Sequence, residues 1–200
     1  MKSLSIIAIT TVFASPVLAG GLNEPYVEPT IAPVVSLGGD WTGGYVGARL
    51  SYGDSSGSGA LGGTPNILDG TGAVYGVQGG YLYDFGTYVM GAELNLNKAD
   101  IDFDSGVGSI DNLHTFKVKA GYDAGRTLIF GSLGAAYADG VAGGTKYDDV
   151  GYVVGAGVEY MINDRVSLGG EVNYHRFDDI DNSGVDVGVT TVGATMNFRF

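Results

Sequence analysis

Tight-turn signals recur at even spacing along this chain, and this repeat restricts the fold more than any other feature. The signals are Asp84-Phe85-Gly86, Asp123-Ala124-Gly125 and Asn163-Asp164-Arg165, with centres 39 residues apart. Asp, Asn and Gly favour such turns because they supply local hydrogen bonds or accept a positive φ. Longer polar stretches alternate with them, at about residues 53–70, 100–111, 139–148 and 177–186. The repeat unit is therefore predicted to be a β-hairpin with short and long connections in alternation.

This spacing predicts an all-β fold of eight antiparallel strands. Each strand is long enough to cross a bilayer, because a tilted membrane-spanning strand needs roughly 9–11 residues. The 36 glycines and 13 tyrosines agree with strands and turns, since glycine weakens helices and tyrosine favours strands. The expected strands are residues 41–52, 71–83, 87–99, 111–122, 127–138, 149–161, 165–176 and 186–200.

The strands alternate apolar and polar residues, which leaves two architectures to compare. On the strand expected at 165–176, Val166, Leu168 and Val172 share one face and Ser167 and Glu171 share the other. In a soluble sandwich or lipocalin the apolar face would be the interior, whereas in an up-and-down transmembrane barrel it meets lipid. Aromatic residues at both strand ends favour the membrane barrel, because two belts of rings are typical of two membrane-water interfaces. The rings beside the short turns or the C-terminus are Tyr83, Tyr88, Tyr122, Tyr160, Phe198 and Phe200, and those beside the long loops are Tyr52, Tyr75, Tyr137, Tyr152 and Tyr174.

The N-terminal segment indicates export. In residues 1–19, Lys2 precedes an apolar run, and Val17-Leu18-Ala19 resembles a signal-peptidase site, so this segment is predicted to be a signal peptide. A retained membrane anchor is the alternative, although the run is short and interrupted by Pro16. Residues 20–39 contain prolines without periodicity and are expected to form an extended periplasmic tether, which leaves residues 40–200 for the barrel.

The charge and the lack of cysteine exclude several classes of function. Loss of Lys2 with the signal peptide changes the formal net charge from −12 to −13, which disfavours nucleic acid as a partner because its phosphates would be repelled. The chain has no cysteine, so disulfides and thiolate chemistry are excluded.

The stretch Asp40-Trp41-Thr42-Gly43-Gly44-Tyr45-Val46-Gly47 resembles the opening motif of opacity-protein-like outer-membrane surface antigens, in which an aromatic residue usually occupies the place of Gly44. This family is similar in architecture to the OmpA-type transmembrane domain, and the resemblance extends over about residues 40–200. It implies an eight-stranded barrel in a bacterial outer membrane. The terminal Phe198-Arg199-Phe200 is similar to the ends of such chains, which implies that Phe198 and Phe200 are an assembly signal for the barrel-assembly machinery.

Seven charged residues fall on the face expected to point inward. Buried charges persist only when they are paired and hydrogen-bonded, so a salt-bridge network that fills the lumen is the favoured interpretation. An ion-conducting path is the alternative, because inward glycines at 76, 80, 91, 134, 155 and 157 leave room for a narrow water-filled cavity. The predicted network comprises Arg49, Glu93, Lys117, Lys119, Glu159, Glu171 and Arg199.

No catalytic, cofactor or metal site is predicted. Asp100 to Asp111 echoes a calcium loop, but Ser105 replaces the sharp-turn glycine and the bidentate Glu is missing. Ser167 lies eight residues from His175, roughly 27 Å along a strand, which is too far for direct activation. His114, near Ser109 and Asp111, has no nucleophile elbow beside it.

These observations lead to three hypotheses of function. The first is an integral outer-membrane barrel with a structural and cell-surface role, whose partners are outer-membrane lipids, lipopolysaccharide and the barrel-assembly machinery. The second is a small porin-like channel for ions or small solutes. The third is an outer-membrane enzyme that modifies lipids. The ligands of the acidic loops, their binding of divalent cations and the oligomeric state stay open.

Overall fold

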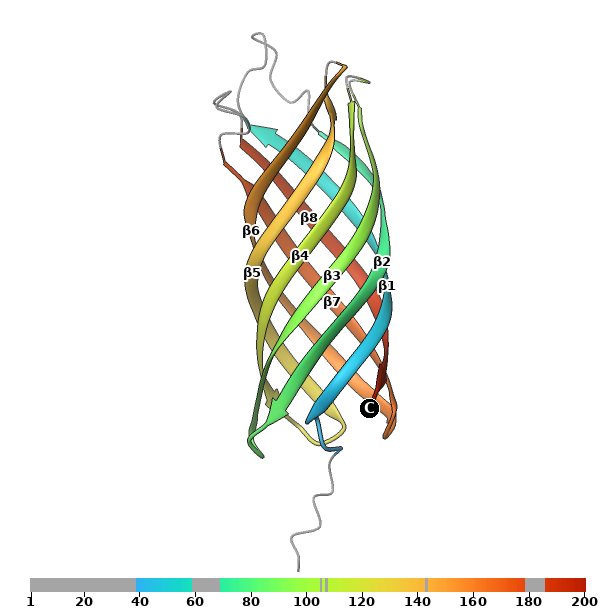
Figure 1. Cartoon of the computed structure of the whole chain (residues 1–200), viewed down its shortest axis with the longest axis vertical. Helices are drawn as coiled ribbons and strands as arrows, with labels where there is room; N and C mark the ends of the chain where they lie inside the picture. The colour runs from blue at the N-terminus through green and yellow to red at the C-terminus, as the bar shows by residue number, and fades with distance from the viewer. Residues whose placement is uncertain (1–38, 59–68, 105, 107, 143, 179–185) are drawn as a thin grey trace, which may run out of the picture. The chain divides into compact units, whose positions relative to one another are not determined.

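The computed structural model describes residues 39–58, 69–104, 106, 108–142, 144–178 and 186–200, and over these ranges the chain forms one closed barrel (Figure 1). The expected signal peptide and, apart from residue 39, the expected tether lie outside the described residues. No helix within the described residues is long and apolar enough to span a membrane. The strands are β1 (Gly43–Ser58), β2 (Gly70–Asp84), β3 (Tyr88–Phe103), β4 (Gly108–Asp123), β5 (Thr127–Ala142), β6 (Thr145–Asn163), β7 (Val166–Phe177) and β8 (Asp186–Arg199).

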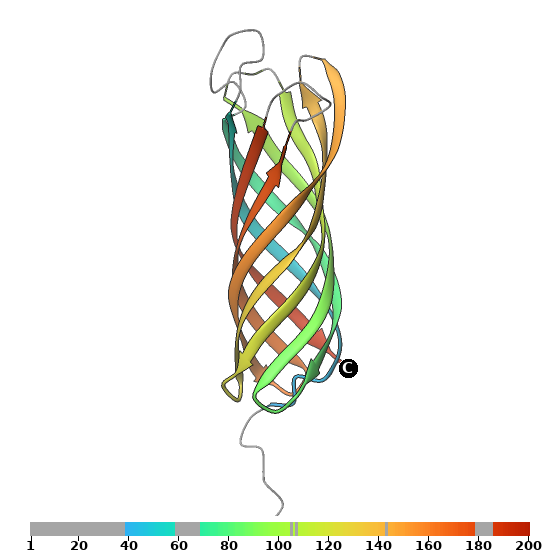
Figure 2. The same ribbon diagram turned by 90° about the vertical axis from the view of Figure 1, so that its left-hand side faces the viewer.

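The predicted all-β class and the eight antiparallel strands are confirmed. Each strand pairs with its sequence neighbours, and β1 pairs with β8 from Tyr45↔Arg199 to Ser58↔Asp186, which closes the barrel (Figure 2). Because the barrel is closed, the backbone N–H and C=O groups of β1 and β8 have hydrogen-bonding neighbours on both sides. That is the condition for placing a sheet in hydrocarbon, where unpaired backbone groups are costly.

The three tight turns form at the predicted places, and side-chain oxygens hold each of them. The Asp84 carboxylate accepts the Gly86 N–H at 2.7 Å, and the Asp123 carboxylate accepts the Gly125 N–H at the same distance. Gly86 and Gly125 adopt φ values of 96° and 80°, a region that side chains disfavour. In the third turn the Asn163 oxygen accepts the N–H groups of Arg165 and Val166, both at 2.9 Å.

The strands extend farther toward the long-loop end than the sequence pattern predicts. Residues 100–103, 108–110, 139–142 and 145–148 were expected in loops but belong to β3, β4, β5 and β6. The prediction failed because the alternation reverses there. On β3, Ile101 and Phe103 are buried inside while Asp100 and Asp102 are exposed outside, as in a soluble sheet.

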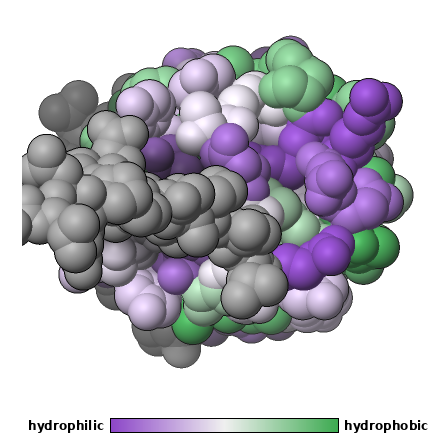
Figure 3. Space-filling view, turned by 90° about the horizontal axis from the view of Figure 1, so that it is seen from below, coloured by the Kyte–Doolittle hydropathy of each residue, from purple (hydrophilic) through white to green (hydrophobic). Residues whose placement is uncertain are grey.

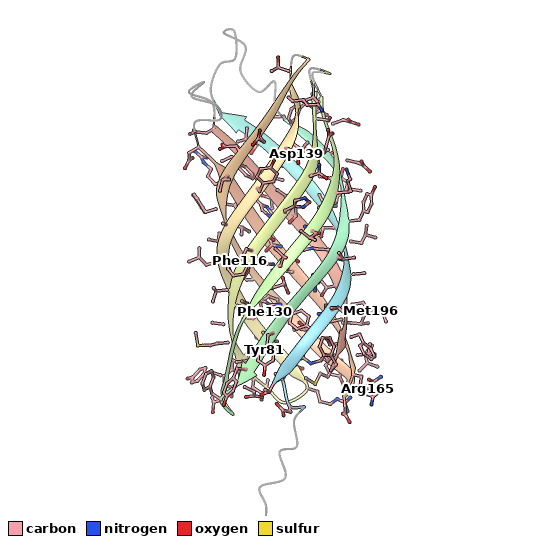
Figure 4. All side chains as sticks on the ribbon, in the orientation of Figure 1. Tyr81, Phe116, Phe130, Asp139, Arg165 and Met196 are labelled. Carbon is pink, nitrogen blue, oxygen red and sulfur yellow. The ribbon has the colours of Figure 1, made fainter. Side chains whose placement is uncertain are left out.

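Below this extension the outer wall is apolar, as predicted for a membrane barrel. Leu50, Leu133 and Val77 are 59–63% exposed on it, and every ring of the two predicted belts is at least 37% exposed. Seen from the short-turn end, hydrophilic residues gather across much of the visible described surface and hydrophobic residues appear around the rim (Figure 3). Figure 4 labels Phe116 and Met196, which are exposed on the wall, and Phe130, which is buried inside.

The first turn offers a test of the turn geometry. Gly86→Ala places a Cβ at a positive φ although no atom lies within 4 Å, so we expect the free energy of unfolding to fall by about 1 kcal/mol. Urea titration of the protein folded into lipid vesicles measures this change. Gly131→Ala is the control, because Gly131 has no positive φ and its nearest neighbour would be 3.8 Å from the new Cβ. Equal losses in the two variants would contradict the role of backbone strain.

Candidate functional site

The barrel brings together the seven charged side chains that the sequence assigns to the lumen. They come from six strands, with Lys117 and Lys119 both on β4, and none is more than 7% exposed. Strand alternation explains their common direction, since residues two apart on one strand point to the same face. The interior face of the barrel is therefore where all seven meet.

The seven residues form a single chain of alternating charge. Each carboxylate contacts two cations, and each of the two lysines contacts two carboxylates. The two lysines of β4 join the layer near mid-barrel to the layer nearer the short turns. In order, the residues are Arg49, Glu171, Lys117, Glu93, Lys119, Glu159 and Arg199.

The centre of this chain is the Glu93 carboxylate. Its Oε1 lies 3.2 Å from the Lys117 ammonium and its Oε2 lies 3.0 Å from the Lys119 ammonium. The Tyr45 hydroxyl donates to Oε2 at 2.6 Å, and the Asn95 amide donates to Oε1 at 3.1 Å. Removal from water is costly for any ion, and this density of partners offsets the cost.

The two ends of the chain are held by the other two carboxylates. Glu171 contacts the Lys117 ammonium and lies 3.4 Å from the Arg49 guanidinium. Glu159 lies 3.9 Å from Lys119 and 3.7 Å from Arg199. The network thus holds four cations and three carboxylates, a formal excess of one positive charge.

Uncharged polar residues complete the network; the sequence analysis weighed Ser167 only for catalysis and assigned no role to Asn197 or Gln78. The Ser167 hydroxyl and the Asn197 amide both donate to Glu159 Oε1, and Gln78 donates to the Asn197 oxygen at 2.7 Å. The only signal for these residues in the sequence is their inward register. That signal says which face they occupy and leaves their partners undetermined.

The short-turn end of the lumen is filled by an apolar plug, defined here as Trp41, Tyr45, Leu82, Val89, Leu128, Phe130 and Met161. Trp41 was expected at the start of a strand, but β1 begins at Gly43 and Trp41 is fully buried. Its indole N–H donates to the Gly125 carbonyl at 3.0 Å, and the Arg199 guanidinium lies 4.9 Å from its ring centre. The Lys119 ammonium lies similarly over Phe130, at 4.0 Å.

The plug also joins the tight turns below the barrel. Asp84 accepts the Trp41 backbone N–H at 3.3 Å and donates its own N–H to the Thr42 hydroxyl at 3.1 Å. Burial raises the pKa of the Asp123 carboxyl in the adjacent turn, and the neighbouring Asp84 carboxylate adds to the rise. Trp41 and Thr42 are thus hydrogen-bonded to two hairpin turns that are distant in sequence, at Asp84 and at Gly125.

The opposite end of the lumen is filled by a second apolar group, which we call the upper core. This differs from the sequence analysis, which expected a polar inward face and a salt-bridge network that fills the lumen. The upper core occupies the reversed section of the strands, where the outer face carries the charges. Its members are Val74, Ala99, Ile101, Phe103, Ile110, Leu113, Ala136, Val153, Phe177, Val187 and Val189.

The space beside inward glycines is occupied. A Cβ on Gly80 would lie 2.7 Å from the Tyr45 hydroxyl, and one on Gly157 would lie 2.6 Å from the Phe130 ring. Side chains from neighbouring strands therefore use the room that these glycines leave. At both positions glycine admits a large ring, and the water-filled cavity considered from the sequence has no space there.

Neither histidine weighed for catalysis is hydrogen-bonded to the serine weighed with it. His175 is buried, with Nδ1 3.0 Å from the Val189 carbonyl, whereas the Ser167 hydroxyl is bonded to Glu159. Ser109 donates to Asp111 at 2.9 Å, and His114 instead accepts the Asn97 N–H on the outer face. No group of three or more His, Cys, Asp or Glu able to hold a metal ion occurs within the described ranges.

Comparisons with known proteins agree with this architecture. Residues 5–198 match the family model described as the outer membrane protein beta-barrel domain. The 31 kDa outer-membrane immunogenic protein of Brucella melitensis is 28% identical over 244 aligned positions that cover all of both chains. The 22 kDa outer membrane protein of Rhizobium leguminosarum bv. viciae is 27% identical over 155 positions, which cover 74% of this chain and 69% of that protein. Neisserial surface protein A has the same fold, with a TM-score of 0.51, 16% identity, and coverage of 80% of this chain and 98% of that one.

The charge network predicts a large energetic effect of one central cation. Lys117→Ala deprives both Glu93 and Glu171 of a partner, so we expect the free energy of unfolding to fall by about 3–5 kcal/mol. Urea titration in lipid vesicles measures the change. Lys146→Ala removes an exposed lysine and is expected to stay within about 0.5 kcal/mol of the native protein. A Lys117→Ala loss as small as that of the control would contradict the network.

The plug predicts the environment of the one tryptophan in the chain. Trp41 fluorescence should be protected from acrylamide quenching in the folded protein, because the ring is fully buried. Arg199→Gln removes the cation over the ring and a hydrogen bond to the Trp41 carbonyl, and should increase quenching. Arg165→Gln, an exposed arginine in the third tight turn, is the control. Unchanged quenching in Arg199→Gln would show that Arg199 does not hold the plug.

Proposed function

Because the chain belongs to the outer membrane protein beta-barrel domain family, we propose that it serves as a sealed structural barrel that displays its long connections at the cell surface. The family match also confirms the predicted bacterial outer-membrane location. The proposal concerns the role beyond that location. It assigns the barrel no catalysis, and it assigns the charge network to holding the wall together.

The observation that carries this proposal is the filling of the lumen in three layers. The plug lies at one end, the upper core at the other, and the charge network between them. Leu82 and Leu128 of the plug and Ile101 and Leu113 of the upper core are each at most 1% exposed. A conducting path needs a continuous polar passage, and two apolar layers in series oppose one.

The surface role is supported by the upper extension of the strands. Asp100, Asp102 and Asp148 are exposed on its outer face, beyond the belt that contains Tyr137 and Tyr152. Charged residues there are compatible with water and not with hydrocarbon. Because outer-membrane barrels have short periplasmic turns and longer extracellular loops, we assign this end to the outside of the cell. Two Brucella relatives are named outer-membrane immunogenic proteins, and we propose a surface position for the long connections of this chain as well.

The terminal aromatic residues are proposed to serve in assembly. Phe198 and Phe200 are 49% and 76% exposed at the short-turn end, where a periplasmic partner would reach them. The Phe200 N–H donates to the Gly44 carbonyl at 3.0 Å, and a Cβ on Gly44 would lie 2.8 Å from the Phe200 ring. Phe200 thus covers the place where the resembling family usually carries an aromatic side chain. The proposed partners are the barrel-assembly machinery and the surrounding lipids.

Planar-bilayer recording tests the sealed barrel against the channel. The native protein is expected to give no discrete conductance above that of the empty bilayer, because two apolar layers block the lumen. Each preparation is first checked by gel migration with and without boiling, which reports a folded barrel.

A channel would give the opposite result. Discrete steps in the native protein that change in Lys117→Ala or Glu171→Ala would overturn the sealed barrel. Steps that are insensitive to both substitutions would place the path elsewhere and would equally contradict the proposal.

A further inference from the structure

The lipid-facing wall is hollowed at one place over β1, β2 and β3. A groove of about 600 Å³ lies there, lined mainly by apolar side chains. Leu94 and Leu96 of β3 flank it on one side and Val46 of β1 on the other, and all three are about half exposed. Its remaining lining is Gly47, Val77, Gln78 and Gly79.

Gly79 gives the groove its depth. It faces outward on β2 and is paired with Val46 on one side and with Leu94 on the other. A Cβ on Gly79 would meet its nearest atoms at 3.5 and 3.7 Å, which are ordinary contact distances. Packing inside the protein therefore does not require glycine at this position, in contrast to Gly80 next to it. The absence of a side chain at Gly79 leaves space on the lipid-facing side of the wall.

A cation lies just above the groove. Lys98 is exposed on β3 two residues beyond Leu96, about 7 Å along the strand, and its partner on β2 is Tyr75 of the upper belt. No ion pair to Lys98 is formed by the residues that the structure describes. Aromatic belts lie at the level of the lipid headgroups, so the unpaired Lys98 ammonium is placed at headgroup height.

His114 on the neighbouring strand supplies a second donor. The Asn97 N–H, on the membrane side of the register shift between Lys98 and Ile101, donates to His114 Nδ1 at 3.1 Å. Because Nδ1 accepts this bond, the imidazole proton is on Nε2. His114 is diagonal to Lys98 across the strand pair and stacks on Tyr137, at 6.2 Å between ring centres. The regular register of β3 and β4 thus places two donors near each other on the outer wall.

We propose that this wall holds one lipopolysaccharide molecule, with a phosphate of its lipid A beside Lys98 and His114 and an acyl chain in the groove over Gly79. Phosphate matches the two donors, and an acyl chain matches the apolar lining. The inference rests on the proposed orientation, in which the long-loop end faces the outer leaflet. The nearest carboxylate on the same face of β3, Asp100, lies on the loop side of Lys98, so the membrane side of Lys98 is left for the phosphate.

Native mass spectrometry of the full-length protein in detergent tests the proposal, with purified lipid A and, separately, phosphatidylethanolamine as probes. We expect one retained lipid A per barrel, in preference to phosphatidylethanolamine. Lys98→Gln should weaken retention about fivefold, the value expected for one cation near a lipid phosphate. Gly79→Leu, which fills the groove, should also weaken it.

Two matched variants serve as controls. Gly170→Leu adds the same side chain at an outward glycine of β7, where a Cβ would have no atom closer than 3.9 Å, and Lys146→Gln removes an exposed lysine away from the groove. Neither should change retention. If Gly79→Leu does not fold, Gly79→Ala replaces it, because its Cβ meets only ordinary contacts.

Equal retention in all variants, or equal retention of the two lipids, would overturn the lipid site. Heat-dependent gel migration of each variant is recorded alongside. A barrel that folds and stays non-conducting but shows no preference for lipid A would remove this inference alone. A barrel that conducts but retains lipid A at Lys98 would remove the sealed-barrel proposal alone.

Discussion

Pairing of backbone groups is the constraint on which the rest of this structure depends. In hydrocarbon no water is available to a free N–H or C=O, so a sheet can cross a membrane only when its first and last strands pair. Here β1 and β8 pair along almost their whole length, from Tyr45↔Arg199 to Ser58↔Asp186. Once the wall is closed, alternation along each strand assigns every side chain either to lipid or to a narrow interior. The charge network and both apolar layers are consequences of that assignment.

The interior is filled by different types of side chain at different positions along the barrel axis. Opposite the hydrocarbon, where outward residues must be apolar, the inward residues are polar and satisfy one another through shared carboxylates such as Glu93 and Glu159. Above the upper belt the outside meets water, and the same alternation then places Ile101 and Phe103 inside. The barrel therefore behaves as a membrane protein along its middle and as a soluble β-protein at its upper end. One continuous set of strands joins the two regimes.

Much of this could be predicted from the sequence, because turn chemistry and alternation are local signals. The turns at Asp84, Asp123 and Asn163 and the assignment of faces through the membrane section needed no tertiary information. The upper strand ends were mistaken for loops because Asp100 and Asp102 were read as polar loop residues, whereas the buried partners between them define a strand. The position of Trp41 depends on Gly125 and Arg199, which are far away in sequence, so no local pattern could reveal it. The same holds for the order of the charges, because register across strands decides which ammonium meets which carboxylate.

The alternating order of the interior charges also bears on how such barrels diverge. Each interior carboxylate serves two cations, so a change at one position leaves two others in need of a new partner, and interior substitutions are coupled. The outer wall carries no comparable linkage, since any apolar side chain of moderate size suits lipid. Wall residues can therefore drift one at a time while the interior changes in sets. Neisserial surface protein A has the same fold at 16% identity, so a closed barrel of this kind does not depend on a particular set of side chains.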